Sequence, residues 1–202
     1  MRILLAGDHC LDRWIIGDTP RASPEGPYMV FTPLSSGSNA GMGGNVEANL
    51  RSLAPDAQVT VLFPEAVTTK TRYVDRKSNY HLLRVDEDAK SPPLSAARFI
   101  DALEADRPDL VLISDYAKGH LTPDNMGAIL LLCENRDIPT AVDTKGILGP
   151  WSRPATVVKI NQVEFEAQLL AGIKPWMEFK NLVVTNGGEL VIIYQNGSET
   201  PI

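Results

Sequence analysis

Residues 110–119 read Leu-Val-Leu-Ile-Ser-Asp-Tyr-Ala-Lys-Gly. The first four form a continuous apolar run, which is typical of a strand buried on both faces of a parallel sheet. Polar residues follow at once, among them Asp115, Tyr116 and Lys118. Because ligands of open α/β sheets bind just beyond the carboxyl ends of the strands, an acid, a phenol and an amine at such an end indicate a functional site. The alternative is that Asp115 and Lys118 only finish the strand and open a turn, since charged residues are common in ordinary loops.

The composition is that of an ordinary soluble globular domain. The chain has 202 residues, of which 44% are hydrophobic and 22% charged, and its formal net charge is −6. This charge gives no reason to expect a nucleic acid or an anionic membrane as partner. No apolar run is as long as a membrane span, and no basic region precedes the first apolar residues, so we expect a cytoplasmic protein. Cys10 and Cys133 have neither metal-ligand nor disulfide spacing, and Cys133 is expected to be a buried structural thiol.

Strands and helices alternate along the chain. Apolar runs predict strands at residues 2–7, 58–63, 110–114, 138–142, 156–160 and 182–184. Amphipathic segments predict helices at residues 46–53, 95–106 and 122–135, and a last helix that ends near residue 171. This alternation predicts an α/β fold with a doubly wound, mostly parallel sheet and right-handed crossovers, followed by a hairpin strand at residues 190–194.

Two segments interrupt this alternation. Residues 13–33 are rich in Gly, Pro and aromatic residues and carry two short strands around a turn, which predicts a flap or a dimerising lid, or equally a β-extension with only a structural role. Residues 67–74 and 80–85 predict two paired strands. In the first of these strands Lys70 and Arg72 fall on one face, where two cations can clamp a phosphate. A solvated sheet edge whose charges oppose aggregation is an equally good interpretation.

Polar residues recur where the predicted strands end. Residues 35–45 are glycine-rich and run into the first helix, so their backbone N–H groups can approach a ligand closely. Pairs of polar or small residues follow five strands: Asp8 and Asp12, Asp115 and Lys118, Asp143 and Lys145, Asn161 and Glu164, and Thr185 and Gly187. Because the carboxyl ends of parallel strands lie along one edge of a sheet, these pairs predict a ligand cleft.

The order of these motifs resembles the PfkB/ribokinase family of carbohydrate kinases. More narrowly, it resembles the D-glycero-β-D-manno-heptose 7-phosphate kinases, which form the kinase domain of bifunctional heptose kinase/adenylyltransferases of ADP-heptose and lipopolysaccharide biosynthesis. The narrow motifs are Arg-Ala-Ser-Pro-Glu at residues 21–25 and Ser-Asp-Tyr-Ala-Lys-Gly at residues 114–119. The resemblance implies a single ribokinase-like domain, a three-layer Rossmann-like arrangement, over residues 1–202, in which residues 13–33 are a small β-lid.

The resemblance also implies site residues, cofactors and partners. The implied substrate-binding residues are Asp12, Arg21, Glu25, Gly43, Gly44, Asn45, Lys70, Arg72, Asp115 and Lys118. The implied nucleotide-binding residues are Asp143, Lys145, Asn161, Glu164, Thr185 and Gly187, with Glu164 acting indirectly on Mg²⁺. ATP would be the co-substrate, a small sugar phosphate the acceptor, and a homodimer would form through the lid.

Three departures from the family pattern change these expectations. Met42 stands where relatives usually have a second glycine, which narrows the sugar pocket, and between Phe63 and Val67 the chain lacks a helix-and-strand segment. The family's Gly-Ala-Gly-Asp motif, which supplies the catalytic base and an anion hole, does not occur before Ile202. We therefore expect an incomplete kinase domain that a further C-terminal segment or chain completes. The alternatives are a non-catalytic sugar-phosphate-binding pseudokinase and a dimerising scaffold.

Overall fold

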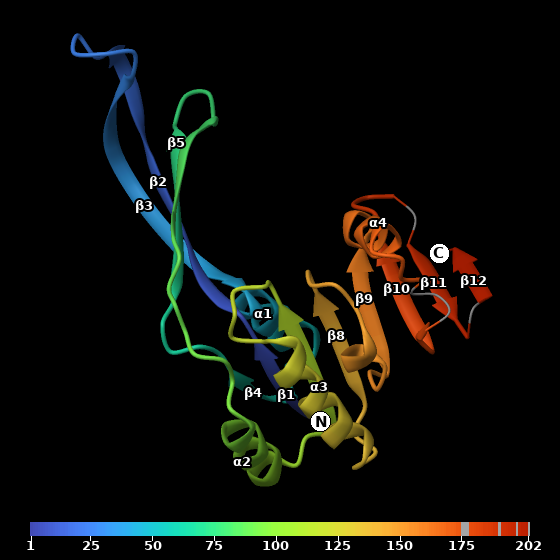
Figure 1. Cartoon of the computed structure of the whole chain (residues 1–202). Helices are drawn as coiled ribbons and strands as arrows, with labels where there is room; N and C mark the ends of the chain where they lie inside the picture. Colours follow the sequence, from blue (N-terminus) through green and yellow to red (C-terminus); the bar gives the residue numbers. More distant parts are fainter. Residues whose placement is uncertain (175–177, 190, 197, 202) are drawn as a thin grey trace.

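The structure is a computed structural model that describes residues 1–174, 178–189, 191–196 and 198–201. Within these residues the strands form two sheets: an eight-stranded core sheet, and a four-stranded sheet, here called the lid sheet, that extends away from it (Figure 1). The expected α/β fold with a doubly wound, mostly parallel sheet is confirmed. None of the described helices has the length and apolar character needed to cross a bilayer.

The core sheet has the strand order β12-β11-β10-β9-β8-β7-β1-β4. Its parallel strands are β1 (Arg2–Gly7), β4 (Gln58–Leu62), β7 (Leu110–Asp115), β8 (Thr140–Thr144), β9 (Val157–Asn161) and β10 (Asn181–Thr185). Two short antiparallel strands, β11 (Ile192–Gln195) and β12 (Ser198–Pro201), complete one side. The predicted hairpin strand corresponds to β11, although residue 190 lies outside the described residues. The stretch at 110–114 pairs in parallel with β1 on one side and β8 on the other, and Val111 and Ile113 are buried, as expected of a strand inside a parallel sheet.

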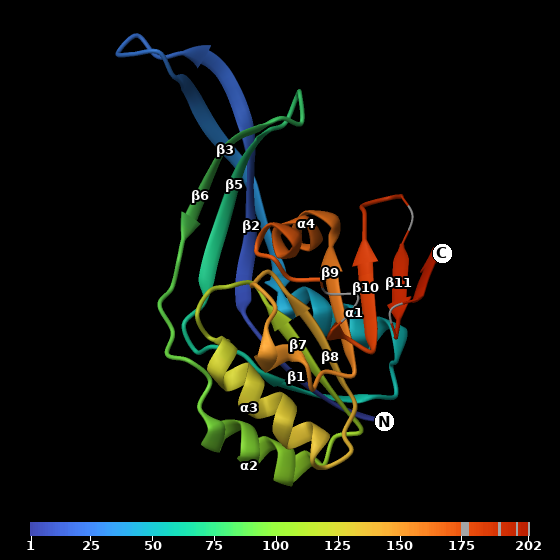
Figure 2. The same ribbon diagram turned by 45° about the vertical axis from the view of Figure 1, so that its right-hand side comes forward.

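Helices cover both faces of the core sheet. They are α1 (Gly43–Leu53), α2 (Ala96–Asp106), α3 (Pro123–Glu134) and α4 (Gln162–Leu170), with a short 3₁₀ helix η1 (Pro150–Ser152). Helices α2 and α3 lie on one face and α1 on the other (Figure 2). The core combines strand residues such as Leu4 and Val111 with helix residues such as Phe99 and Leu130. Cys133 is part of this core, and burial raises the pKa of its thiol to about 11, which fits the expected structural role.

The lid sheet is larger than the sequence predicts. It consists of β2 (His9–Ala22), β3 (Met29–Met42), β5 (Thr68–Asp75) and β6 (His81–Glu87), in the order β3-β2-β5-β6. The two strands predicted at 67–74 and 80–85 are therefore confirmed as a pair, but they belong to the lid. The glycine-rich stretch at 35–42 is strand rather than loop, because it pairs residue by residue with β2. The lid thus reaches well beyond the expected 13–33.

A buried carboxylate holds the turn between β5 and β6. Asp75 accepts hydrogen bonds from the backbone N–H of Ser78 (2.8 Å), from its hydroxyl (2.7 Å) and from the Thr19 hydroxyl (2.8 Å). These hydrogen bonds, those of Ser78 foremost, lower the pKa of Asp75 to about 2. The turn of one lid hairpin is thereby tied to the neighbouring strand β2.

We expect this carboxylate to make the stability of the protein depend on pH in the acid range. The pKa of Asp75 in the folded protein lies below its unfolded value of 3.8. Its contribution to the free energy of unfolding is therefore complete above about pH 4 and is lost as the pH falls through about 2. Urea denaturation at a series of pH values should show this decline, and the decline should be shallower in Asp75→Asn. If the free energy of unfolding falls equally steeply with pH in the wild type and in Asp75→Asn, Asp75 is not the group responsible.

Candidate substrate and nucleotide site

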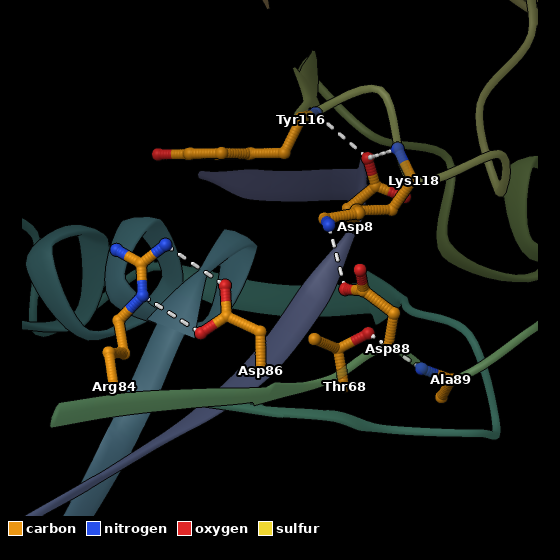
Figure 3. Close-up of polar contacts among 8 residues, drawn as sticks. All are labelled: Asp8, Thr68, Arg84, Asp86, Asp88, Ala89, Tyr116 and Lys118. Carbon is orange, nitrogen blue, oxygen red and sulfur yellow. Dashed lines mark hydrogen bonds and ion pairs between the residues drawn. The ribbon is translucent and has the colours of Figure 1, made fainter. Parts of the chain in front are cut away.

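The loop after β7 is anchored by a carboxylate from the neighbouring strand. Asp8, which directly follows β1, is only 1% exposed, and its Oδ2 accepts hydrogen bonds from the backbone N–H groups of Tyr116 (2.8 Å) and Lys118 (3.2 Å) (Figure 3). Between them Ala117 has a φ of 55°, a left-handed conformation that is uncommon for a residue with a side chain. Successive N–H groups in such a turn form a concavity for an anion, and here the carboxylate of Asp8 fills it. Asp8 therefore positions the loop, a role that its place after β1 alone does not reveal.

Asp115 is buried at the carboxyl end of β7. Its Oδ2 accepts a hydrogen bond from the Thr144 hydroxyl (2.6 Å), and its Oδ1 accepts one from the backbone N–H of Ala117 (2.8 Å). Burial raises the pKa of Asp115, and the two hydrogen bonds oppose that rise. The carboxylate is thus held rigidly at the edge of the sheet, as the sequence predicts.

The Tyr116 side chain, on the loop after β7, contacts the loop after β8. Its ring is close to the Lys145 ammonium, whose Nζ is 4.6 Å from the ring centroid, a cation–π geometry. Burial raises the pKa of Tyr116, and the negative charges of Asp143, Glu164 and Asp12 raise it further. These charges come from β8, α4 and the lid sheet respectively, so the phenol is within electrostatic range of both the implied nucleotide residues and the implied substrate residues.

One face of the lid sheet carries the substrate-binding side chains expected from the sequence. Asp12 of β2 lies beside Lys70 of β5, and Trp14 lies beside Arg72. Arg72 donates from Nη1 to the Asp12 carboxylate (2.5 Å), and its guanidinium carbon lies 5.9 Å from the centroid of the Trp14 ring. The structure therefore brings Asp12, Lys70 and Arg72 together.

The next lid strand adds charges to the same face. Arg84 forms a two-point ion pair with Asp86, with Nε–Oδ1 at 2.8 Å and Nη2–Oδ2 at 3.0 Å. Lys118 Nζ lies 2.7 Å from Asp88 Oδ1, which joins the loop after β7 to the end of this strand. Figure 3 shows the side chains of Arg84, Asp86 and Asp88 on one side of their segment, facing the loop that carries Lys118. The alternation Arg-x-Asp-x-Asp at 84–88 was the available sequence signal for these residues.

The start of α1 contributes less than the sequence predicts. The N–H of Gly43 donates to the backbone carbonyl of Asp8 (2.9 Å), so it is not free for a ligand. Gly44 packs against the His9 ring, whereas Asn45 is exposed. Met42 has φ 55° and ψ −127°, a conformation that side chains rarely adopt, and is buried. A glycine at this position would adopt that conformation without strain.

The implied nucleotide residues follow β8, β9 and β10. Asp143 lies 3.3 Å from Lys159 Nζ, and the backbone N–H of Lys145 donates to the Asp115 carbonyl (3.2 Å). Thr185 pairs with Asn161 across β10 and β9, and Gly187 follows with a φ of 56°.

Asn161 and Glu164 form a capping box at the start of α4. The Asn161 side chain accepts from the Glu164 N–H (2.8 Å), and Glu164 Oε2 accepts from the Asn161 N–H (2.7 Å). The Asn-x-x-Glu pattern is therefore also explained by helix capping alone. The capping box uses Glu164 Oε2 and not Glu164 Oε1. In the described part of the chain, no three His, Cys, Asp or Glu side chains form a group that can hold a metal ion.

Two predicted substrate residues lie far from the others. Arg21 pairs with Val30 near the tip of the lid, nine residues along β2 from Asp12, and Glu25 lies in the turn beyond. At about 3.3 Å per residue, Arg21 is roughly 30 Å from Asp12 along the strand. Glu25 accepts a hydrogen bond from the Tyr28 hydroxyl (3.1 Å). Within one chain the structure does not bring Arg21 or Glu25 to the site.

The fold is ribokinase-like. The whole chain superposes on a carbohydrate kinase from Agrobacterium tumefaciens with a TM-score of 0.66 and 16% sequence identity, covering 75% of that chain. It superposes on phosphofructokinase-2 from Escherichia coli in complex with fructose-6-phosphate with a TM-score of 0.63 and 15% identity, covering 99% of this chain and 78% of that one. The resemblance to the PfkB/ribokinase kinases is confirmed at the level of the fold.

The sequence is similar to bifunctional proteins named HldE. The chain is 32% identical to the bifunctional protein HldE of Geobacter sulfurreducens over 193 residues, which cover 81% of this chain and 39% of that protein. It is 27% identical to HldE of Syntrophotalea carbinolica, covering 98% of this chain and 49% of that protein. The chain thus spans less than half the length of these relatives. No family model matches it.

Proposed function

We propose that this chain is a sugar-phosphate kinase domain resembling heptose 7-phosphate kinase, which binds a sugar phosphate and receives the γ-phosphoryl group of ATP on its anomeric hydroxyl. The observation that carries the proposal is the lid face on which Asp12, Lys70 and Arg72 lie together, joined to the Asp115 loop through the Lys118–Asp88 ion pair. Carboxylates bind sugar hydroxyls and paired cations bind phosphate, so this face suits a sugar phosphate.

One group of residues would bind the sugar phosphate, and Asp115 would lie at the end of the sugar that reacts. Asp12 and Asn45 would hold sugar hydroxyls, with Gly43 and Gly44 shaping the pocket, and Lys70 and Arg72 would hold the substrate phosphate. Asp115, kept in place by Thr144, would face the reacting end of the sugar. Phosphoryl transfer depends mainly on positioning and electrostatic stabilisation, which such a rigid edge can provide.

The nucleotide would lie along the ends of β8, β9 and β10. Asp143 belongs to β8, Thr185 is paired with Asn161 at the ends of β10 and β9, and Lys145 and Gly187 follow β8 and β10, so these residues would face the nucleotide, with Lys145 as a cation next to the phosphates. Mg²⁺ bound to ATP neutralises charge on the transferring group. Because Glu164 has one oxygen committed to the capping box, it would act on the ion only indirectly, through its other oxygen and water. An ATP-dependent kinase of this kind would work in the cytoplasm.

A further segment would supply the catalytic base. The chain covers only 75% of the carbohydrate kinase of Agrobacterium tumefaciens, and no Gly-Ala-Gly-Asp sequence occurs in residues 1–202. General-base catalysis typically contributes a factor of about 10²–10⁴ in rate. We therefore propose that efficient turnover requires a C-terminal segment, in the same protein or in a second chain.

The test is ATP-dependent phosphorylation of heptose 7-phosphate, followed by ³¹P NMR. Residues 1–202 should turn over very slowly alone, and at least a hundredfold faster when joined to the C-terminal part of the kinase domain of an HldE relative. Omitting ATP or Mg²⁺ provides the control. Absence of turnover in the joined protein, despite binding of the sugar phosphate, would favour the alternative of a non-catalytic sugar-phosphate-binding pseudokinase.

We also propose that the chain forms a homodimer through its lid. In the alternative of a dimerising scaffold, this dimer would be the only function of the lid. A hollow of about 510 Å³ on the lid is lined by Tyr28, Met29, Phe31, Tyr73, Leu82 and Leu83, together with Thr19 and Pro27. Several of these apolar side chains are exposed, including Tyr28 (54%) and Leu83 (57%). Exposed apolar surface of this kind suits contact with a second lid. A dimer in sedimentation velocity without any ligand binding would favour the scaffold.

A further inference from the structure

The ammonium group of Lys145 contacts an aromatic ring and, within the described part of the chain, forms no ion pair. Its Nζ lies 4.6 Å from the centroid of the Tyr116 ring. Asp143, the nearest acid along the chain, pairs instead with Lys159 of β9, at 3.3 Å. The Lys145 side chain is exposed. The cation that follows β8 is therefore oriented by a ring and has no carboxylate in direct contact among the described residues.

The backbone of Tyr116 is fixed on the side opposite to its ring. Its N–H donates to the buried carboxylate of Asp8 (2.8 Å). Figure 3 shows the ring extending from the loop in the direction away from that carboxylate. The ring is half-buried, whereas the residues that follow it, from Ala117 to Gly119, are exposed. The position of the ring is thus set by the core of the protein, although the loop itself is at the surface.

The backbone around Lys145 is fixed as well. The Lys145 N–H donates to the carbonyl of Asp115 (3.2 Å). On the other side, the Gln168 side chain of α4 donates to the carbonyl of Gly146 (3.3 Å) and accepts from the N–H of Leu148 (2.8 Å). Gln168 is only 1% exposed, so these contacts are shielded from water. Both partners of the ring–ammonium contact are therefore held by buried polar groups.

An aromatic ring orients a cation without neutralising it. A carboxylate in the same place would compete with an anionic ligand for the ammonium and would repel that ligand. Burial raises the pKa of Tyr116, and the negative charge of Asp143 raises it further, so the phenol stays neutral and does not pair with Lys145 as an anion. By contrast, the ammonium of Lys118 is paired with Asp88 (2.7 Å).

We propose that Tyr116 is a positioning residue, whose ring holds the ammonium of Lys145 beyond the carboxyl end of β8 as a cation for the phosphates of a nucleotide. Lysine loses much rotamer freedom when it is ordered, and a ring that orders it before binding lowers that cost. This inference rests on the proposed function and adds Tyr116, which is not among the implied nucleotide-binding residues.

The contact itself is tested without any ligand. Reductive ¹³C-methylation keeps the charge of lysine and gives each lysine an NMR signal. The signal of Lys145, assigned by its absence in Lys145→Arg, should be shifted upfield by the ring current of Tyr116. The shift should persist in Tyr116→Phe, which keeps the ring face, and should be lost in Tyr116→Leu. A Lys145 signal at the same position in wild type and Tyr116→Leu would overturn the contact.

The role of the contact is tested by calorimetric titration of the unmodified 202-residue chain with ATP and Mg²⁺. Tyr116→Leu should bind ATP about three- to fivefold more weakly, as expected for loss of one cation–π contact near the surface, and Tyr116→Phe should bind like the wild type. Lys145→Met should weaken binding, and adding Tyr116→Leu to it should cause no further loss. Tyr80→Leu is the matched control, because Tyr80 is 73% exposed and directly precedes β6.

The outcomes separate this role from the proposed function. A loss of affinity in Tyr116→Phe equal to that in Tyr116→Leu would assign the effect to the hydroxyl and overturn the role of the ring. So would an effect of Tyr116→Leu that is undiminished in the Lys145→Met background, or one no larger than that of Tyr80→Leu. Absence of ATP binding by the wild type, with the Lys145 signal still shifted, would overturn the nucleotide site and the positioning role together.

Discussion

Replacing Arg72 with alanine is expected to weaken binding of heptose 7-phosphate about 100-fold, the largest effect on ligand binding that the structure predicts. The substitution removes the charge-assisted hydrogen bonds from the Arg72 side chain to the phosphate, each worth about 1.5–3 kcal/mol. It also leaves the carboxylate of Asp12, which Arg72 contacts at 2.5 Å, unpaired beside the incoming anion. Isothermal titration calorimetry measures this change directly.

Two comparison variants separate these causes. Arg72→Lys keeps the charge but not the fork of donors, so it should lose less than Arg72→Ala. Asp12→Asn in the Arg72→Ala background removes the unpaired carboxylate and should recover affinity for inorganic phosphate, whose binding does not use the sugar-binding role of Asp12. Equal affinity of wild-type protein and Arg72→Ala for heptose 7-phosphate would contradict this placement of the phosphate.

Replacing Asp8 with alanine is expected to cause the largest loss of stability, about 2–4 kcal/mol. The change removes the acceptor of two backbone hydrogen bonds, from Tyr116 and Lys118, and each bond to a charged group is worth about 1.5–3 kcal/mol. The loss is partly offset because Asp8 Oδ1 is buried without a hydrogen-bond partner among the described residues. Urea denaturation followed by circular dichroism gives the free energy of unfolding.

Asp8→Asn is the control for this prediction. Its side-chain oxygen can still accept both N–H groups, and its neutral amide is less costly to bury than a carboxylate. We therefore expect Asp8→Asn to lose less than half of what Asp8→Ala loses, and to keep sugar-phosphate binding. If both variants are as stable as the wild type, Asp8 does not hold the loop.

The core of the fold was predictable because local sequence determines it. The run at 110–113 is apolar throughout, which is typical of a strand in a sheet that other elements cover on both faces. Carboxyl ends of parallel strands share an edge, so the clustering of Asp115 with the segments that carry Asp143 and Asn161 followed from the strand assignments. The helix predicted from residue 122 is likewise confirmed, since Thr122 caps the start of α3 through contacts within one turn of helix.

The lid was less predictable because its strands depend on long-range pairing. Residues 35–42 have almost no apolar alternation, and they are extended because β2 pairs with them. The register that places Arg84 opposite Arg72 is a property of two strands together and is not visible in either alone. Sequence motifs also grouped Arg21 and Glu25 with the site, whereas the length of β2 separates them from Asp12 within one chain.

The most direct test of the central claim is a calorimetric comparison of heptose 7-phosphate with the same heptose lacking its phosphate, using the 202-residue chain without nucleotide. Since Lys70 and Arg72 would contact only the phosphate, the phosphorylated sugar should bind at least tenfold more tightly, and added salt should reduce this difference. Equal affinity for the two sugars, or no binding of either, would contradict a sugar-phosphate site on the lid face.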